Sequence, residues 1–269
     1  MSTGYVDVDG GRLYYESTGS SGPVVVLVHP GLWDMRTWDP QLGPLTEAGY
    51  GVVRYDLRGY GRSSRLTSEP YSHVADLAAL LDAMTIPRAA LVGCSLGGAV
   101  AIDFTLEYPD RVWALVPVAS GLGGFEALEE EDQWWEERSA PIEAAIESGD
   151  LERAEDLRLE IWAPLGVQDE AGSRIRAIAF DNLHEITMDE SSEVELDPPA
   201  AHRLAEIDVP TLVMVAEHDP PSMRRIGDLI ARGVLGARKV TIAGADHVVS
   251  LRQPEALNQA LLSFLAEAR

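Results

Sequence analysis

The turn at residues 93–97, Gly-Cys-Ser-Leu-Gly, constrains the fold more than any other segment of the chain. It follows a short apolar run, precedes a segment of helical composition, and matches the pattern G-x-S-x-G. So tight a turn between a strand and a helix needs small residues two positions either side of the serine, where the two elements approach each other. The serine is then strained, and its hydroxyl projects from the sheet. The pattern therefore predicts that Ser95 is a nucleophile.

Two other interpretations of this turn are a glycine-rich phosphate loop and a plain tight turn. No lysine follows at the position that a P-loop requires, and the glycine spacing differs from G-x-G-x-x-G. The position of the turn, between a strand and a helix near mid-chain, favours the nucleophile.

Apolar runs alternate with helical patterns on both sides of the turn. A Gly-Gly pair at residues 10–11 predicts a hairpin between the first two strands. Strand–helix alternation predicts an α/β fold with a mostly parallel sheet, helices on both faces, and functional residues at the carboxyl ends of the strands. The expected strands are residues 5–9, 13–16, 24–28, 51–55, 89–93, 113–118, 211–215 and 238–242, and the clearest helices are 74–84, 98–107 and 254–268.

An acidic, helical middle interrupts this pattern after the sixth strand. Residues 125–203 contain 23 acidic and 6 basic side chains, whereas the rest of the chain contains 21 and 15. We therefore expect a core of residues 1–121 and 204–269 with a helical cap at residues 122–203. Within the cap, Pro141, Gly149 and Pro164 are predicted to interrupt helices.

The overall charge limits the partners of the protein. The 269 residues carry a formal charge of −23, which disfavours binding to nucleic acid or to anionic membrane surfaces. No apolar run reaches the ~18 residues of a membrane span. Residues 1–7 lack the features of a signal peptide, and Cys94 is the only cysteine, so neither a disulfide nor a cysteine zinc site can form within the chain. We expect a cytoplasmic protein with a small-molecule substrate; its oligomeric state is left open.

A serine hydroxyl needs a base to accept its proton. Of six histidines, His247 is the best candidate because it follows the last predicted strand. Asp219, after the preceding strand, is the best candidate for the acid that orients this base. Asp246 is adjacent in sequence and poorly placed to orient the ring, and Glu217 and Asp208 are weaker competitors.

An oxyanion hole needs two backbone N–H groups. One is expected from Leu96, which follows the serine, and the other from the loop after the strand at residues 24–28. Pro30 has no N–H, so Gly31 is the first choice and Leu32 the second. We expect His29 to fix this loop by hydrogen bonding.

Several other residues receive a structural or a pocket-forming interpretation. In the glycine-rich turn at residues 56–64, Asp56 and Arg58 are expected to make local hydrogen bonds and ion pairs. Elsewhere, Cys94 is expected to be a small buried residue.

A cap over the strand ends must form the roof of any pocket. The cap's charge favours neutral or cationic substrates over anionic ones. The predicted substrate-binding residues are Leu32, Trp33, Phe125, Trp134, Trp135 and Trp162.

The chain resembles the α/β-hydrolase fold family with a cap domain, over its whole length except residues 125–203. The segments that carry the resemblance are residues 29–31, 55–63, 93–98, 108–112, 217–219 and 246–247. The resemblance implies Ser95, Asp219 and His247 as a triad and Gly31 and Leu96 as oxyanion donors. Pro30 stands where the family usually has glycine. The serine nucleophile disfavours epoxide hydrolase and dehalogenase chemistry, which uses aspartate.

Residues 38–41 and 54–59 are similar to those of 3-oxoadipate enol-lactonases and related esterases. We therefore expect a serine hydrolase of a small carboxylic ester or lactone, with neither a metal ion nor an organic cofactor. The same residues could cleave an amide, a thioester or a carbon–carbon bond. A receptor with little turnover and a cofactor-free oxidative or lyase activity are alternatives from other classes.

Overall fold

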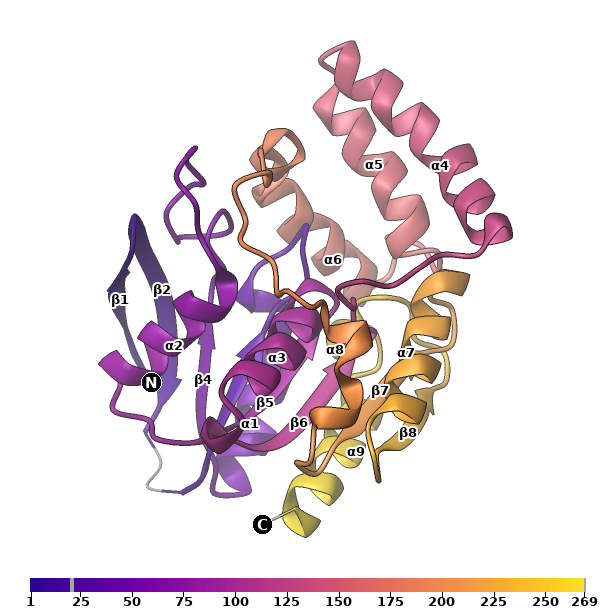
Figure 1. Cartoon of the computed structure of the whole chain (residues 1–269). Coiled ribbons are helices and arrows are strands. Elements are labelled where there is room, and N and C mark those ends of the chain that lie inside the picture. Colours follow the sequence, from indigo (N-terminus) through magenta and orange to yellow (C-terminus); the bar gives the residue numbers. More distant parts are fainter. Residues whose placement is uncertain (20–21, 269) are drawn as a thin grey trace.

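The computed structural model describes residues 1–19 and 22–268, and in them a single eight-stranded sheet organises the chain (Figure 1). The strand order is β1-β2-β4-β3-β5-β6-β7-β8. Only the pairings β1–β2 and β2–β4 are antiparallel in the described residues, so the sheet is mostly parallel, as predicted. The strands are β1 (Ser2–Val8), β2 (Gly11–Thr18), β3 (Val24–Val28), β4 (Gly51–Tyr55), β5 (Ala89–Cys94), β6 (Val112–Val118), β7 (Leu212–Ala216) and β8 (Arg238–Ile242).

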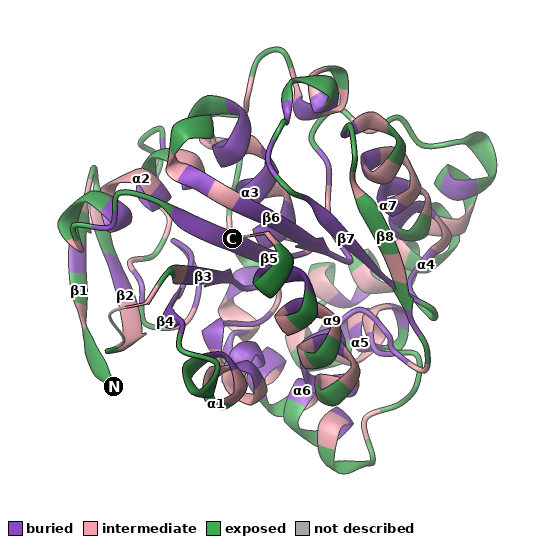
Figure 2. Cartoon of the chain, turned by 90° about the horizontal axis from the view of Figure 1, so that it is seen from below, coloured by how far each residue is buried: buried purple, intermediate pink, exposed green. Residues whose placement is uncertain are grey.

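Alternate residues of each central strand face opposite layers of helices. Val26 and Val28 of β3 pack in one core cluster, with the helices at residues 73–83, 96–107 and 221–233, whereas Val25 and Leu27 pack in another, with those at 39–47 and 254–267. Figure 2 shows the buried strands between these two layers. The helices of the core are α1 (Asp39–Glu47), α2 (His73–Ala83), α3 (Leu96–Glu107), α7 (Pro221–Gly233), α8 (Val249–Arg252) and α9 (Pro254–Glu267).

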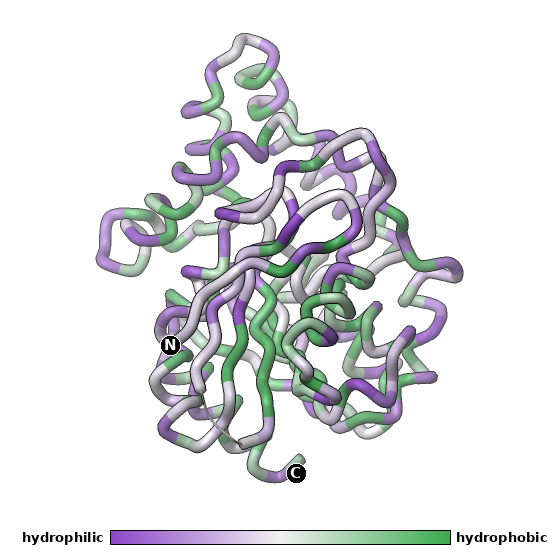
Figure 3. Tube along the Cα trace, turned by 90° about the vertical axis from the view of Figure 1, so that its left-hand side faces the viewer, coloured by the Kyte–Doolittle hydropathy of each residue, from purple (hydrophilic) through white to green (hydrophobic). Residues whose placement is uncertain are grey.

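The insertion between β6 and β7 is helical, and part of it protrudes above the sheet (Figure 1). It contains α4 (Glu129–Glu147), α5 (Leu151–Trp162), α6 (Glu170–Asp181) and the short 3-10 helix η3 (Leu183–Thr187). In Figure 3 the central strands are green, whereas hydrophilic purple residues recur along the cap. None of the helices in the described residues is both long and apolar enough to cross a membrane.

One of the three predicted helix interruptions is wrong. Gly149, with a φ of +79°, separates α4 from α5, and Pro164 follows the end of α5. Pro141, however, lies inside α4. Proline removes the hydrogen bond to the carbonyl four residues earlier, here that of Glu137. Glu137 is exposed, so water can bond to this carbonyl and the helix can continue.

Candidate active site

Ser95 is the single residue between the end of β5 and the start of α3. Its φ and ψ are +52° and −116°, a conformation that costs energy in any residue with a Cβ atom. A Cβ on Gly93 would lie 2.0 Å from the carbonyl oxygen of Gly97, and one on Gly97 would lie 2.3 Å from that of Val28. Both glycines are therefore required by close packing of the helix start, as the sequence pattern predicted.

His247 and Asp219 meet at the same edge of the sheet. His247 follows β8 and Asp219 follows β7, and Nδ1 of the imidazole donates to Oδ1 of the carboxylate at 2.8 Å. The two residues are 2% and 4% exposed, so the contact is shielded from water. Within the described residues, no hydrogen bond is recorded at the Ser95 hydroxyl. Such contacts are often long without substrate and shorten when it binds.

The three competing carboxylates have other partners or positions. Asp246 pairs with the buried guanidinium of Arg252, at 2.8 Å. Glu217 is exposed and accepts a hydrogen bond from the backbone N–H of Gly244. Asp208 is exposed and precedes β7. Asp219 alone among the four contacts the His247 ring in the part of the chain that the structure describes.

The segment after β3, residues 29–34 and here called the β3 loop, is fixed by His29. Its Nδ1 donates to the Pro30 carbonyl at 2.7 Å, and its Nε2 accepts from the Leu57 N–H at 2.8 Å. Burial lowers the pKa of His29 to about 4, because a charged imidazolium would lose its hydration. A neutral ring can donate at one nitrogen and accept at the other. The expected structural role of His29 is confirmed.

The candidate oxyanion donors come from two segments that touch. A Cβ on Gly31 would lie 3.9 Å from Cδ2 of Leu96, so the β3 loop lies against the start of α3. Leu32 has a φ of +68°, a left-handed conformation that persists only where the surroundings hold it. No hydrogen bond is recorded for the amides of Gly31, Leu32 and Leu96 within the described residues. All three remain candidates.

The segment after β4, residues 56–64 and here called the β4 loop, is held by polar contacts both within the loop and to neighbouring segments. Asp56 accepts hydrogen bonds from the backbone N–H groups of Met35 and Arg62, and burial raises its pKa to about 6. The Arg58 guanidinium forms a buried pair with Asp76 at 2.6 Å. The structural interpretation of this loop is confirmed, but the contacts are less local than expected, because Met35 and Asp76 lie outside the loop.

Cys94 is 1% exposed, and its thiol contacts the carbonyl oxygen of His247 at 3.5 Å. Burial, and then the charge of Asp219, raise the pKa of this thiol well above its usual value. Cys94 therefore packs as a small buried residue, as expected.

The predicted pocket residues do not share one environment. Trp33 is fully buried, and its indole N–H donates to the Ile175 carbonyl of α6 at 2.9 Å. Phe125 packs against the core beneath the guanidinium of Arg225. Leu32 is half-buried beside Trp33. For these three residues, contact with substrate stays a prediction.

The remaining aromatic residues form a row that ends at the candidate base. Ring centroids are 4.9 Å apart for Trp134 and Trp135, 5.3 Å for Trp135 and Trp162, and 4.3 Å for Trp162 and His247. The His247 backbone N–H also donates to the Trp162 carbonyl, at 3.3 Å. The sequence predicted these tryptophans as pocket walls; it did not predict that one of them covers the imidazole.

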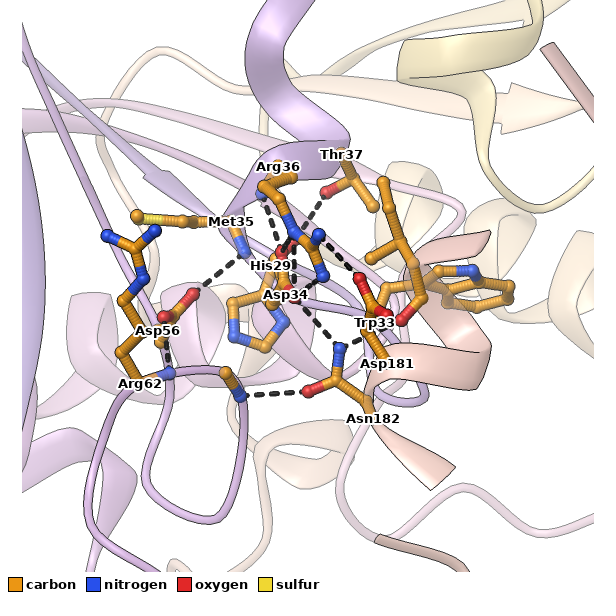
Figure 4. A network of polar contacts seen from close by, with 12 residues as sticks. His29, Trp33, Asp34, Met35, Arg36, Thr37, Asp56, Arg62, Asp181 and Asn182 are labelled. Atoms are coloured by element: carbon orange, nitrogen blue, oxygen red, sulfur yellow. Dashed lines mark hydrogen bonds and ion pairs between the residues drawn. The ribbon is translucent and has the colours of Figure 1, made fainter. Parts of the chain in front are cut away.

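A polar network joins the cap to the β3 loop (Figure 4). Asn182, at the end of α6, donates to the Asp34 carboxylate at 2.8 Å, and Arg36 bridges Asp34 and Asp181. Arg36 and Asn182 together hold the pKa of Asp34 below its usual value despite burial. The sequence did not predict this network, because no spacing pattern in the chain signals it.

These features define the class of protein. A parallel sheet with a strained serine between β5 and α3, and a histidine–carboxylate pair after β7 and β8, is the arrangement of the α/β hydrolases. The family model described as "Alpha/beta hydrolase family" matches residues 25–260. The chain belongs to this family.

Individual relatives agree with this assignment. A 2-hydroxy-6-oxononadienedioate/2-hydroxy-6-oxononatrienedioate hydrolase of Escherichia coli is 26% identical over 271 residues, covering 95% of this chain and 91% of the relative. A hydrolase structure from Pseudomonas aeruginosa PA01 is 30% identical, with a TM-score of 0.74 and 98% of each chain covered. The enol-lactonase of Burkholderia xenovorans LB400 shares the fold at 22% identity, with a TM-score of 0.76, covering 98% of this chain and 100% of that one.

Proposed function

We propose that the protein is a serine hydrolase that cleaves a small carboxylic ester or lactone through an acyl-enzyme. The observation that carries the proposal is the buried 2.8 Å contact between His247 and Asp219, at the sheet edge where Ser95 occupies its strained turn. The enol-lactonase that shares the fold supports this substrate class only by analogy.

The proposed reaction has two halves. His247 takes the proton of Ser95 as the hydroxyl oxygen attacks the carbonyl carbon, and Asp219 stabilises the imidazolium. The amides of Leu96 and of Gly31 or Leu32 donate to the developing oxyanion. The imidazolium then protonates the departing alkoxide, leaving the acyl group on Ser95. In the second half, His247 activates a water molecule that releases the acid and restores the serine.

The test combines covalent labelling with turnover. A fluorophosphonate probe should label the wild type and not Ser95→Ala, and a panel of p-nitrophenyl esters of rising acyl length should report the size of the pocket. We expect Ser95→Ala and Asp219→Asn each to lower kcat/KM by about 10⁴-fold. The first variant lacks the nucleophile, and the second stabilises the wrong tautomer of His247. Equal labelling of wild type and Ser95→Ala would sink the proposal.

The Escherichia coli relative supports a second candidate, hydrolysis of an unsaturated oxo-dioate. Such a substrate is anionic, whereas the acidic cap led us to expect neutral or cationic substrates. Including a 2-hydroxy-6-oxo-dienedioate in the substrate panel separates the two candidates. Faster turnover of this compound than of any ester in the panel would favour the second.

A further inference from the structure

Asn182 is a buried residue at the end of α6 whose side chain connects three parts of the chain. It is 1% exposed. Its Nδ2 donates to Oδ2 of Asp34 at 2.8 Å and to the Ile178 carbonyl at 2.9 Å, and its Oδ1 accepts from the Gly61 N–H at 2.8 Å. Figure 4 shows these contacts between α6, the β3 loop and the β4 loop. Both ends of the amide are therefore used, in a site shielded from water.

The position of Asp34 is coupled to that of the β3 loop. Asp34 comes two residues after Leu32, and its carboxylate accepts hydrogen bonds from the backbone N–H and the guanidinium of Arg36. Its carbonyl accepts from the Thr37 N–H at 3.1 Å. These bonds fix Asp34 to the turn that follows it, and only Trp33 separates Asp34 from Leu32, so a displacement of Asp34 is transmitted to Leu32 through the backbone.

A second anchor binds the neighbouring residue to the same helix. The indole N–H of Trp33 donates to the Ile175 carbonyl at 2.9 Å. Two consecutive residues of the β3 loop, Trp33 and Asp34, are thus bound to α6. A strained conformation such as that of Leu32 is maintained only when surrounding contacts over-determine it, and the two residues that follow Leu32 supply such contacts.

We propose that Asn182 is a positioning residue: through Asp34 it holds the β3 loop so that its backbone N–H groups are aligned for the oxyanion. This inference rests on the proposed acyl-transfer function. The oxyanion donors act only when they point to where charge develops, and a displacement of about 1 Å can cost about 10²-fold in rate. The cap then contributes to the chemical step as well as to access.

The test replaces the amide with a carboxyl group of the same shape. Asn182→Asp keeps an acceptor for the Gly61 N–H but removes the donor to Asp34, leaving two carboxyl groups in contact. We expect kcat to fall by about 10- to 100-fold with KM changed by less than about 3-fold. The affinity for a trifluoromethyl ketone, whose adduct with Ser95 places an oxyanion in the same position, should fall by a similar factor. Titration with the fluorophosphonate corrects for inactive protein.

The matched control is Glu131→Gln, another carboxyl–amide exchange, at a partly buried contact between α4 and the core. Glu131 is 5% exposed and binds Arg225 of α7, away from the β3 loop. We expect its kcat and ketone affinity to stay within about 2-fold of wild type. If Asn182→Asp does not fold, as judged by circular dichroism, Asn182→Ala is measured in its place.

The outcomes separate the two proposals. If the wild type is labelled and turns over esters, but the Asn182 variant matches Glu131→Gln in kcat and ketone affinity, the inference is overturned while the proposed function stands. A change in KM alone would also overturn it. A wild type that is neither labelled nor dependent on Ser95 would remove the basis of both.

Discussion

Helices α4 and α6 belong to the same insertion, yet they relate to the core in opposite ways. In α4 only Glu131 and Ala145 are buried, whereas α6 buries Gly172, Ile175, Ile178 and Ala179. Ile175, Ile178 and Ala179 share a hydrophobic cluster with Trp33 of the β3 loop and with Val248, next to His247. Helix α6 thus packs against the segments that form the candidate site, whereas α4 buries only two of its residues.

The charge of the two helices follows the same division. Helix α4 contains eight acidic residues and one arginine, whereas α6 contains two of each sign. Packing against the core favours apolar residues and balanced charge, whereas a helix that faces water tolerates an excess of acidic residues. Helix α4, which buries few of its residues, therefore contains eight of the 23 acidic residues in residues 125–203.

The largest expected effect tests whether α6 holds the molecule together and α4 does not. Ile175 of α6 is fully buried, and Ile142 of α4 is partly exposed. We expect Ile175→Ala to lower the free energy of unfolding by about 3 kcal/mol through lost burial and a cavity, and Ile142→Ala by less than about 1 kcal/mol. Urea unfolding of both variants measures the difference; equal losses would break the comparison.

Acid should lower the free energy of unfolding through His29, which fixes the β3 loop against which α6 packs. Unfolded His29 binds a proton below about pH 6.5, but burial lowers the pKa of the folded residue to about 4. The free energy of unfolding therefore falls as pH falls between these values, by about 2 kcal/mol at about pH 5. His29→Gln removes this group, so urea unfolding at about pH 7.5 and pH 5 should show a smaller pH dependence than wild type. If the free energy of unfolding of wild type and His29→Gln depended equally on pH, His29 would not be the buried neutral group described above.

The third prediction tests whether Trp162, at the end of α5, contributes to the candidate site as α6 does. Trp162 lies 4.3 Å from the His247 ring, and an aromatic face can stabilise the imidazolium formed during catalysis by about 1 kcal/mol. We expect Trp162→Leu to slow fluorophosphonate labelling by about 5-fold. Trp113→Leu is the control. Trp113 lies near the start of β6, at the edge of the sheet opposite to the candidate site, and its ring stacks on that of Tyr50. Equal slowing in both variants would exclude a specific role.

The sequence predicted the features that depend on element order and local geometry. Strand–helix alternation places the residues after β5, β7 and β8 at one edge, which is why Asp219 and His247 could be paired before their contact was seen. The glycines of the Ser95 turn follow from local sterics. The catalytic roles of these residues stay predictions.

The missed features depend on contacts between distant segments. Asn182 and Asp34 are 148 residues apart, and a helix-terminal asparagine has many ways to satisfy its amide, so its sequence context does not identify a partner. Pro141 was assigned as a helix interruption from propensity alone, but whether its lost hydrogen bond matters depends on exposure to water, which only the packing of α4 decides.

The smallest effect concerns the charge of α4. Glu129, Glu130 and Asp132 are exposed, so replacing all three with their amides should change the free energy of unfolding by less than about 0.5 kcal/mol. If the acidic cap filters substrates, the variant should gain up to about 3-fold in kcat/KM for a carboxylate-bearing ester relative to its neutral analogue at about 10 mM salt, and lose this gain at about 150 mM, where the screening length shortens to about 8 Å. An unchanged ratio at both salt concentrations would show that these three charges of α4 do not select substrates, so that any contribution of this helix to the site would come from Trp134 and Trp135 instead.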